Sequence, residues 1–137
     1  MNTYRKPLPD TTDGSQPFWD ACRRHELVMQ ECGACGHRRW PIGPSCTRCL
    51  SMEFTWVKVA GTGEVWSWIV YHQAFNQAFA DDVPYNVALI RMDEGHTMIS
   101  NIVESDSSDI RIGQRVEVVF DDVNDDISIP RFRQVEQ

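Results

Sequence analysis

Two pairs of cysteines lie close together in the chain, and their spacing suits a metal site. Each pair has the form Cys-x-x-Cys, and ten residues separate the two pairs. A Cys-x-x-Cys turn points both sulfurs to one side, so two such turns can supply the four thiolates of a tetrahedral site that leaves no position open to water. The sequence therefore predicts a structural metal site whose ligands are Cys32, Cys35, Cys46 and Cys49.

Zinc is the expected metal. A segment of this size cannot build a hydrophobic core, and bound zinc would contribute folding free energy on the order of 10 kcal/mol in its place. Iron is an alternative, because four thiolates also suit a rubredoxin-type centre. Two disulfides or four unrelated thiols are further alternatives, which the lack of secretory features disfavours. Gly36 suits the end of the first turn, whereas Leu50 at the same place in the second pair predicts a less regular turn.

Length and charge bound the rest of the chain. Its 137 residues contain no signal peptide and no apolar run near the ~20 residues of a membrane span, so we expect a cytoplasmic protein with reduced thiols. The net charge of −7 is uneven: residues 1–58 hold eight basic and six acidic residues, and residues 59–137 hold five and fourteen. An anionic ligand should therefore prefer the first part of the chain.

The residues before the cysteines predict a leader and a short helix. Within residues 1–26, Ser15 and Pro17 are typical of a helix start. Phe18 and Trp19 share one face of this helix, and they dock either on the chain's own domain or on a partner protein. Residues 27–53 are then predicted to form a ribbon, in which residues 27–31 and 39–41 are the strands that flank the first cysteine pair.

From residue 54 onward the apolar residues recur with a period of two, which indicates strands. Five or six antiparallel strands without a crossover helix favour a closed barrel, because closure removes exposed sheet edges. We predict an OB-fold barrel over residues 54–137, with an SH3-like barrel as the alternative. The expected elements are a hairpin of residues 54–59 and 64–72, a second hairpin of 85–92 and 97–103, and strands at 115–120 and 130–133.

Several motifs occur in the order typical of a known two-part family. They are Pro17-Phe18-Trp19, Cys32-x-x-Cys35-Gly36, Cys46-x-x-Cys49, Gly61-x-Gly63, Pro84-Tyr85, Glu94-Gly95, Ile112-Gly113 and Pro130-Arg131-Phe132. Over nearly its whole length the chain resembles the family in which a rubredoxin-like zinc ribbon precedes an acyl-CoA-associated OB-fold, known as domain of unknown function family 35. The resemblance implies a mainly β protein with an N-terminal helix, the ribbon, and a five- or six-stranded antiparallel barrel.

The resemblance also implies a function. Such proteins are similar to non-catalytic accessory subunits of thiolase-superfamily enzymes, namely acyl-CoA thiolases, aldolases and acyltransferases, although some relatives join a hydratase instead. The expected protein is one member of a hetero-oligomer that supports assembly and acyl-CoA binding. Its structural zinc is expected at the four cysteines. The catalytic residues are expected in the partner.

Two sets of residues are candidates for contacts outside the chain. Guanidinium groups suit phosphate oxygens, so Arg38, Arg39 and Arg48 are candidate contacts for the phosphates of CoA; the alternative is that they pair with acidic residues of the partner. Aromatic residues beyond those that a small ribbon and barrel readily bury are candidates for the partner interface, unless they pack inside the chain. These are Phe18, Trp19, Trp40, Phe75 and Phe79.

Other functions compete with this interpretation. Zinc ribbons and OB-folds also occur in nucleic-acid-binding modules, but a barrel segment with a charge of −9 would repel phosphates. A rubredoxin-like electron carrier is a third possibility. We predict no active site within the chain, because no pattern joins His25, His72 or His96 to a nucleophile and because Cys22 suits apolar packing.

Overall fold

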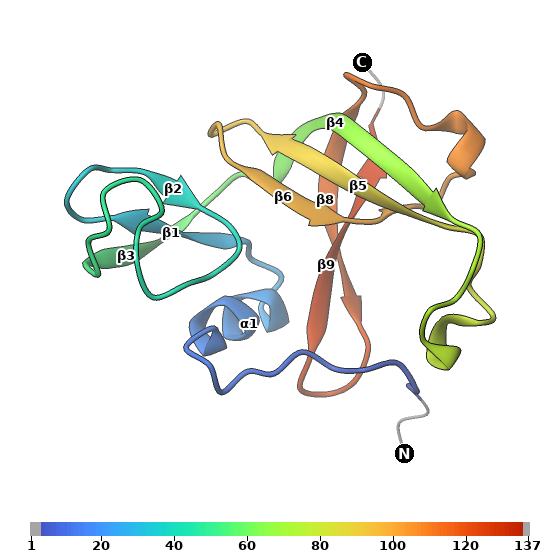
Figure 1. Cartoon of the computed structure of the whole chain (residues 1–137), viewed down its shortest axis with the longest axis horizontal. Coiled ribbons are helices and arrows are strands. Elements are labelled where there is room, and N and C mark those ends of the chain that lie inside the picture. Colours follow the sequence, from blue (N-terminus) through green and yellow to red (C-terminus); the bar gives the residue numbers. More distant parts are fainter. Residues whose placement is uncertain (1–3, 136–137) are drawn as a thin grey trace.

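The computed structural model describes residues 4–135, which form a short helix and two sheets (Figure 1). In chain order the elements are α1 (Gln16–Arg23), β1 (Val28–Cys32), β2 (Arg38–Arg39), β3 (Phe54–Lys58), β4 (Thr62–Tyr71), β5 (Tyr85–Met92), β6 (Thr97–Ser100), β7 (Ile102–Val103), β8 (Arg115–Asp122) and β9 (Ser128–Gln134), with 3-10 turns at Gln77–Phe79 and Ser107–Asp109. No helix within residues 4–135 is long and apolar enough to cross a membrane.

The first sheet is the ribbon, with strand order β2-β1-β3 and antiparallel pairing throughout. In it, Val28 pairs with Lys58 and Cys32 with Phe54, so β3 belongs to the ribbon along its whole length. The predicted hairpin of residues 54–59 and 64–72 is therefore wrong. Alternation identified both strands correctly, but β3 pairs with a strand that precedes it by more than twenty residues. The division of the chain at residue 54 stays a prediction, and the strand pairing favours a division near residue 59.

The second sheet is the OB-fold barrel, with strand order β6-β5-β4-β8-β9-β7. All pairs are antiparallel except β7 with β9, which is parallel. The two outermost strands, β6 and β7, are separated along the chain by Asn101 alone. One stretch of chain thus pairs first with β5 and then with β9, which closes the sheet on itself. The mainly β fold with an N-terminal helix, a ribbon and an OB-fold barrel is confirmed.

Two asparagines provide hydrogen-bond partners for backbone groups at the point where the stretch leaves β5 and joins β9. The side chain of Asn86 accepts a hydrogen bond from the backbone N–H of Ile102 (2.7 Å) and donates one to the Ile102 carbonyl (2.8 Å). The carbonyl of Asn101 accepts the N–H of Phe132 (2.9 Å). Buried backbone groups need hydrogen-bond partners, and the Asn86 side chain provides them for Ile102 in place of the β5 backbone.

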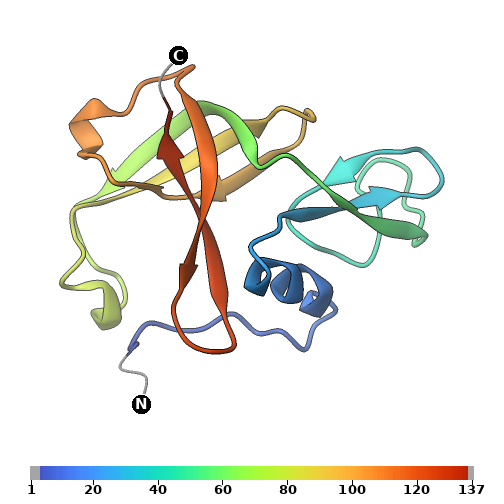
Figure 2. The same ribbon diagram turned by 180° about the vertical axis from the view of Figure 1, so that it is seen from behind.

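A single cluster of buried residues joins the helix and ribbon to the barrel. Phe18 and Cys22 of α1, together with Leu27 and Met29, pack in the same core as the barrel residues around Phe132. Beyond the end of α1, the ring of His25 stacks on Phe120 of β8 at 5.1 Å. The two parts are therefore held together by shared apolar burial as well as by the chain that links them (Figures 1 and 2).

His96, in the turn between β5 and β6, is buried without a hydrogen bond to its ring. Its exposed fraction is 7%, and both ring nitrogens lack a partner among the residues that the structure describes. Burial lowers its pKa below the ordinary value of 6.5; the nearby Glu94 carboxylate opposes this shift and the Arg38 guanidinium adds to it. The folded protein therefore holds His96 neutral at a pH where the unfolded chain would begin to take up a proton.

This difference in pKa predicts a loss of stability in mild acid. As the pH falls through 6.5, the unfolded chain binds a proton at His96 before the folded chain does, which favours unfolding. Relative to His96→Gln, the wild type should lose unfolding free energy between about pH 7.5 and pH 5.5. Urea unfolding of both metal-loaded proteins measures this, with His72→Gln, at an exposed histidine, as the control for replacing a histidine by glutamine. Parallel pH profiles for wild type and His96→Gln would contradict it.

Candidate metal centre

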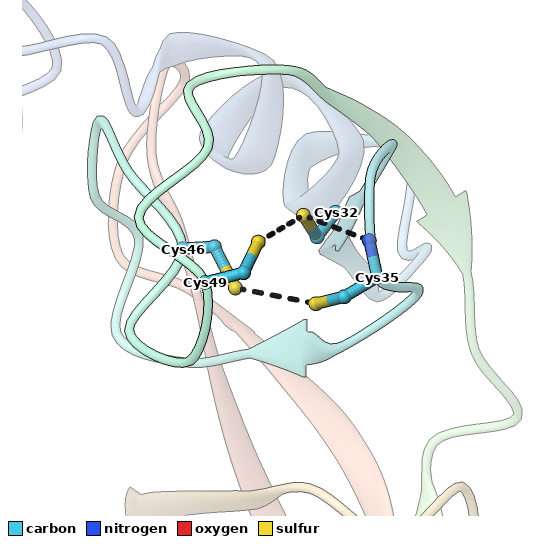
Figure 3. Close-up of side chains that lie close together, drawn as sticks. All are labelled: Cys32, Cys35, Cys46 and Cys49. Carbon is cyan, nitrogen blue, oxygen red and sulfur yellow. Dashed lines mark hydrogen bonds between the residues drawn. The ribbon is translucent and has the colours of Figure 1, made fainter.

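The four predicted cysteines converge at one end of the ribbon (Figure 3). Cys32 ends β1 and Cys35 lies in the turn to β2, whereas Cys46 and Cys49 come from the long loop between β2 and β3. Their four sulfurs all lie within 4.8 Å of one another. Cys32 Sγ lies 3.5 Å from Cys49 Sγ, and Cys35 Sγ lies 3.7 Å from Cys46 Sγ. Each of these short contacts joins one cysteine pair to the other.

These distances fit a metal and not a disulfide. A disulfide needs sulfurs about 2.05 Å apart, and all five cysteines are free thiols. Four sulfurs at about 2.3 Å from a central ion would be roughly 3.8 Å apart along each tetrahedral edge. The separations of 3.5 and 3.7 Å between the sulfurs are close to this value. The residues present therefore fit a tetrahedral metal ion with four thiolate ligands.

Backbone amides point at the sulfurs and favour their ionised form. The N–H groups of Ala34 and Cys35 donate to Cys32 Sγ at 3.4 and 3.5 Å, and the N–H of Arg48 donates to Cys46 Sγ at 3.3 Å. The Cys35 amide lowers the pKa of the Cys32 thiol to about 6, although burial opposes it. The Cys49 amide likewise lowers the pKa of Cys46. Thiolates are the species that ligate metals, so the loops prepare these sulfurs for a cation.

Cys49 behaves differently because negative charge accumulates around it. The N–H of Ser51 lowers its pKa, but the sulfur of Cys32, burial, and the sulfurs of Cys35 and Cys46 outweigh this effect and raise the pKa to about 12. The proton on Cys49 is thus held by the neighbouring sulfurs together with burial. A divalent cation bound among the four sulfurs would offset the repulsion between them and favour loss of this proton.

The two cysteine turns share one backbone conformation. Gly36 N–H donates to the Cys32 carbonyl (3.0 Å), and Leu50 N–H donates to the Cys46 carbonyl (2.9 Å). Both residues have a left-handed backbone, with φ of 77° for Gly36 and 67° for Leu50. The prediction of a less regular second turn is wrong. Leu50 adopts the conformation that glycine adopts without strain, and its side chain is 76% exposed.

Gln30 is a positioning residue that sequence reasoning missed. Its buried side chain donates to the Gly43 carbonyl and accepts from the Gly43 N–H, both at 2.9 Å. It thereby fixes the loop that carries the second cysteine pair against β1. The available signal was a neutral amide side chain directly after the apolar residues that begin the strand, because a buried amide needs local partners.

Loss of one ligand should abolish stoichiometric metal binding. We expect Cys46→Ser to leave the purified protein with well under one metal ion per chain and with an unfolded ribbon, because three thiolates leave one coordination position open and one metal–sulfur bond unmade. Elemental analysis gives the metal content, and near-UV circular dichroism reports Trp40 in the ribbon. The control is Cys22→Ala, which removes the cysteine outside the site and should keep the metal. Full metal content in Cys46→Ser would contradict the assignment.

The three arginines that were predicted to contact CoA differ in their exposure and in their partners. Arg39 is 3% exposed, its guanidinium lies 5.2 Å from the centre of the Phe54 ring, and it donates to the Gly43 carbonyl. Arg39 is thus unsuited to a soluble phosphate, and its prediction is corrected on this ground. Arg38 is half-buried and pairs with Glu31 at 3.2 Å. Arg48 is exposed and forms no ion pair within residues 4–135.

The five aromatic residues predicted at the interface are also placed differently from one another. Phe18 is 3% exposed and belongs to the core, so it has no surface to offer a partner. Trp19 and Trp40 are half-buried and line one groove. Phe79 is half-buried beside Tyr85, and Phe75 is 78% exposed. Four of the five therefore present some surface.

A four-cysteine rubredoxin-like ribbon joined to an OB-fold barrel defines a class of two-part proteins, and comparison with known sequences agrees. Residues 19–55 match the family model described as the ChsH2 rubredoxin-like zinc ribbon domain. Residues 56–121 match the one described as the ChsH2 C-terminal OB-fold domain. A DUF35 domain-containing scaffold protein of Methanocaldococcus jannaschii is 33% identical over 104 residues, which are 75% of this chain and 73% of that protein. The chain belongs to the DUF35 family.

Two further relatives resemble the chain over nearly all of its length. A probable enoyl-CoA hydratase alpha subunit of Thermomonospora curvata is 34% identical over 128 residues, which are 93% of this chain but only 40% of that protein. Among solved structures, one chain of the Ltp2-ChsH2(DUF35) aldolase superposes with a TM-score of 0.79 and 34% identity, covering 94% of this chain and 98% of that one. The resemblance to the hydratase subunit thus concerns one part of a longer protein.

Proposed function

We propose that the chain is a non-catalytic, zinc-binding accessory subunit of a thiolase-superfamily enzyme that acts on an acyl-CoA. The observation that carries this proposal is the likeness to the ChsH2(DUF35) chain of the aldolase, which extends over 98% of that chain. That structure's name couples this kind of chain with a second component, Ltp2, and the archaeal relative is named a scaffold protein. The chain also resembles 40% of a probable enoyl-CoA hydratase alpha subunit. A hydratase partner, instead of a thiolase-superfamily enzyme, is therefore the alternative.

Zinc is the metal that we assign to the four cysteines. Four thiolates in a tetrahedron suit a borderline-soft ion without a preferred d-electron geometry, and the matching family model is described as a zinc ribbon. Bound there, zinc would supply folding energy and no hydrolytic chemistry, since four protein ligands leave no position for water or substrate. Reduced thiols at this site also fit the cytoplasmic location predicted from the sequence.

The properties of Cys22, the cysteine outside the metal site, support the proposal that catalysis belongs to a partner. Cys22 of α1 is fully buried in the core, and burial raises its pKa to about 12. At neutral pH it therefore stays protonated and is a poor nucleophile. In the proposed complex, the acyl-transfer or carbon–carbon cleavage step belongs to residues of the catalytic partner, and this chain contributes assembly.

Purification of the complex tests the accessory role. The tagged chain, purified from its host at moderate salt, should retain a thiolase-superfamily enzyme in a fixed ratio, which mass spectrometry identifies. The partner enzyme assayed with and without this chain should need it for full activity. A matched preparation of Cys46→Ser, whose ribbon has lost its metal, should retain less of the enzyme. Recovery of nucleic-acid-binding machinery or of no stoichiometric protein would refute the proposal.

We further propose that Arg48, aided by Arg38, contacts the phosphates of CoA in this complex. Arg48 is exposed and carries no ion pair in the described part of the chain. Replacing Arg48 with Ala should weaken CoA binding by the assembled complex by about fivefold or more, since charge-assisted hydrogen bonds to phosphate are lost. Calorimetry on the complex measures this. Arg111→Ala, an exposed arginine of the barrel, is the control. Unchanged CoA affinity together with impaired assembly would assign Arg48 to the protein interface instead.

A further inference from the structure

The outer surface of the barrel is divided into two chemically different halves, which lie on opposite sides of the molecule (Figures 1 and 2). On the β8–β9 half, outward side chains form ion pairs across the strands. Arg133 contacts Glu117 at 2.8 Å, and Arg131 contacts Asp121 at 2.9 Å. This is the composition expected of a sheet that faces water.

The β4–β6 half is apolar on its outer side. Along β5, Asn86, Ala88, Ile90 and Met92 are buried toward the barrel interior, yet the alternate positions that face outward include Val87 and Leu89. Their outward neighbours are Ile69, which pairs with Val87, and Ile99, which pairs with Leu89.

Ile69 and Ile99 are 54% and 51% exposed. Between Val87 and Ile90, β5 is apolar on both faces, although Arg91 is exposed at its end. Apolar residues on both faces are typical of a sheet that is covered on both sides, and the barrel interior covers only one of them.

This surface continues into a groove beside the helix and ribbon. A hollow of about 220 Å³ lies over the four outward residues, and a groove of about 560 Å³ lies next to it. Both are lined by Val87 and Ile99, so they form one surface. The far wall of the groove is made by Trp19 of α1 and by Trp40 and Ile42 of the ribbon loop, and Ile129 and Pro130 of β9 also line it. We call the set Trp19, Trp40, Ile42, Ile69, Val87, Leu89 and Ile99 the apolar face.

Negative charge lies at the edge of this face. Asp10 and Asp13 line the groove, and both are exposed. Their Oδ1 atoms accept hydrogen bonds from Thr12 and Ser15, respectively, and these bonds hold the two carboxylates in place. Neither forms an ion pair with a basic side chain within residues 4–135. A complementary surface would therefore combine apolar side chains with a lysine or arginine.

We propose that the apolar face is the docking surface for the catalytic partner subunit, whose docking segment places apolar side chains over Ile69, Val87, Leu89 and Ile99 and a basic side chain against Asp10 and Asp13. This inference rests on the proposed function, because it assumes that an enzyme partner exists. A second copy of the chain fits less well, since a two-fold contact through this face would bring the unpaired carboxylates of both copies to one apolar surface.

Charged substitutions on the two halves of the barrel test the proposal. In Ile69→Glu/Ile99→Glu, docking would bury two unpaired carboxylates, so affinity for the purified partner enzyme should fall at least about tenfold. Val119→Glu introduces one carboxylate on the β8–β9 half, where Val119 pairs with Arg131, and should bind within about twofold of wild type; Ile69→Glu alone is the matched single-charge variant and should bind more weakly than Val119→Glu. Asp10→Lys/Asp13→Lys should also weaken binding and should remove part of its salt dependence.

Several readouts keep the outcomes distinct. Circular dichroism and zinc content establish that each variant is folded, and calorimetry with the purified enzyme gives the affinities. Wild-type affinity in a folded Ile69→Glu/Ile99→Glu variant overturns this docking surface while the accessory function stands. If the wild-type chain binds no thiolase-superfamily enzyme from its host, the proposed function fails and the docking surface with it. A wild-type dimer in sedimentation that the double variant abolishes would identify a second copy as the occupant and overturn the proposal.

Discussion

The ribbon depends on neutralising four sulfur atoms that lie within 4.8 Å of one another. Between residues 33 and 53, only Arg39 and Cys46 are buried, so this segment has almost no apolar core of its own. Thiolates this close repel each other, and a metal ion bound among them would replace that repulsion with the main attraction that holds the loops. The same loops carry Trp40 and Ile42, which form one wall of the groove. The shape of the apolar face is therefore linked to occupancy of the metal site.

The sequence was most informative where chemistry and spacing coincide. The Cys-x-x-Cys pairs identified all four sulfurs that meet, and alternating apolar residues located most strands of the barrel, because each pattern is local. The sequence was less informative about which strands pair with each other. Phe54–Lys58 alternates in the same way whether it pairs with β1 or β4, and only the folded chain decides between them.

Side-chain environment was the other gap. Arg39 looks like a surface cation in the sequence, yet its guanidinium is buried against Phe54, because long basic side chains can pack along apolar surface. Leu50 in a left-handed turn was also beyond the sequence, since the geometry of the two cysteine turns overrides the preference of that residue. The apolar run of β5 did carry a signal for the apolar face, namely the absence of polar residues at its outward positions Val87 and Leu89.

The closure of the barrel has a consequence for the order in which the chain can assemble during synthesis. All three strands of the ribbon and its four cysteines precede β4, so the ribbon sheet and its metal site can form before the barrel is complete. The stretch from Thr97 to Val103, in contrast, needs β5 on one side and β9 on the other, and β9 is the last strand of the described chain. Until β9 emerges, β7 is an open edge that can pair with another chain. The growing protein therefore passes through a stage in which the barrel has an open strand edge, and this stage ends once β9 has been made and has paired with β7.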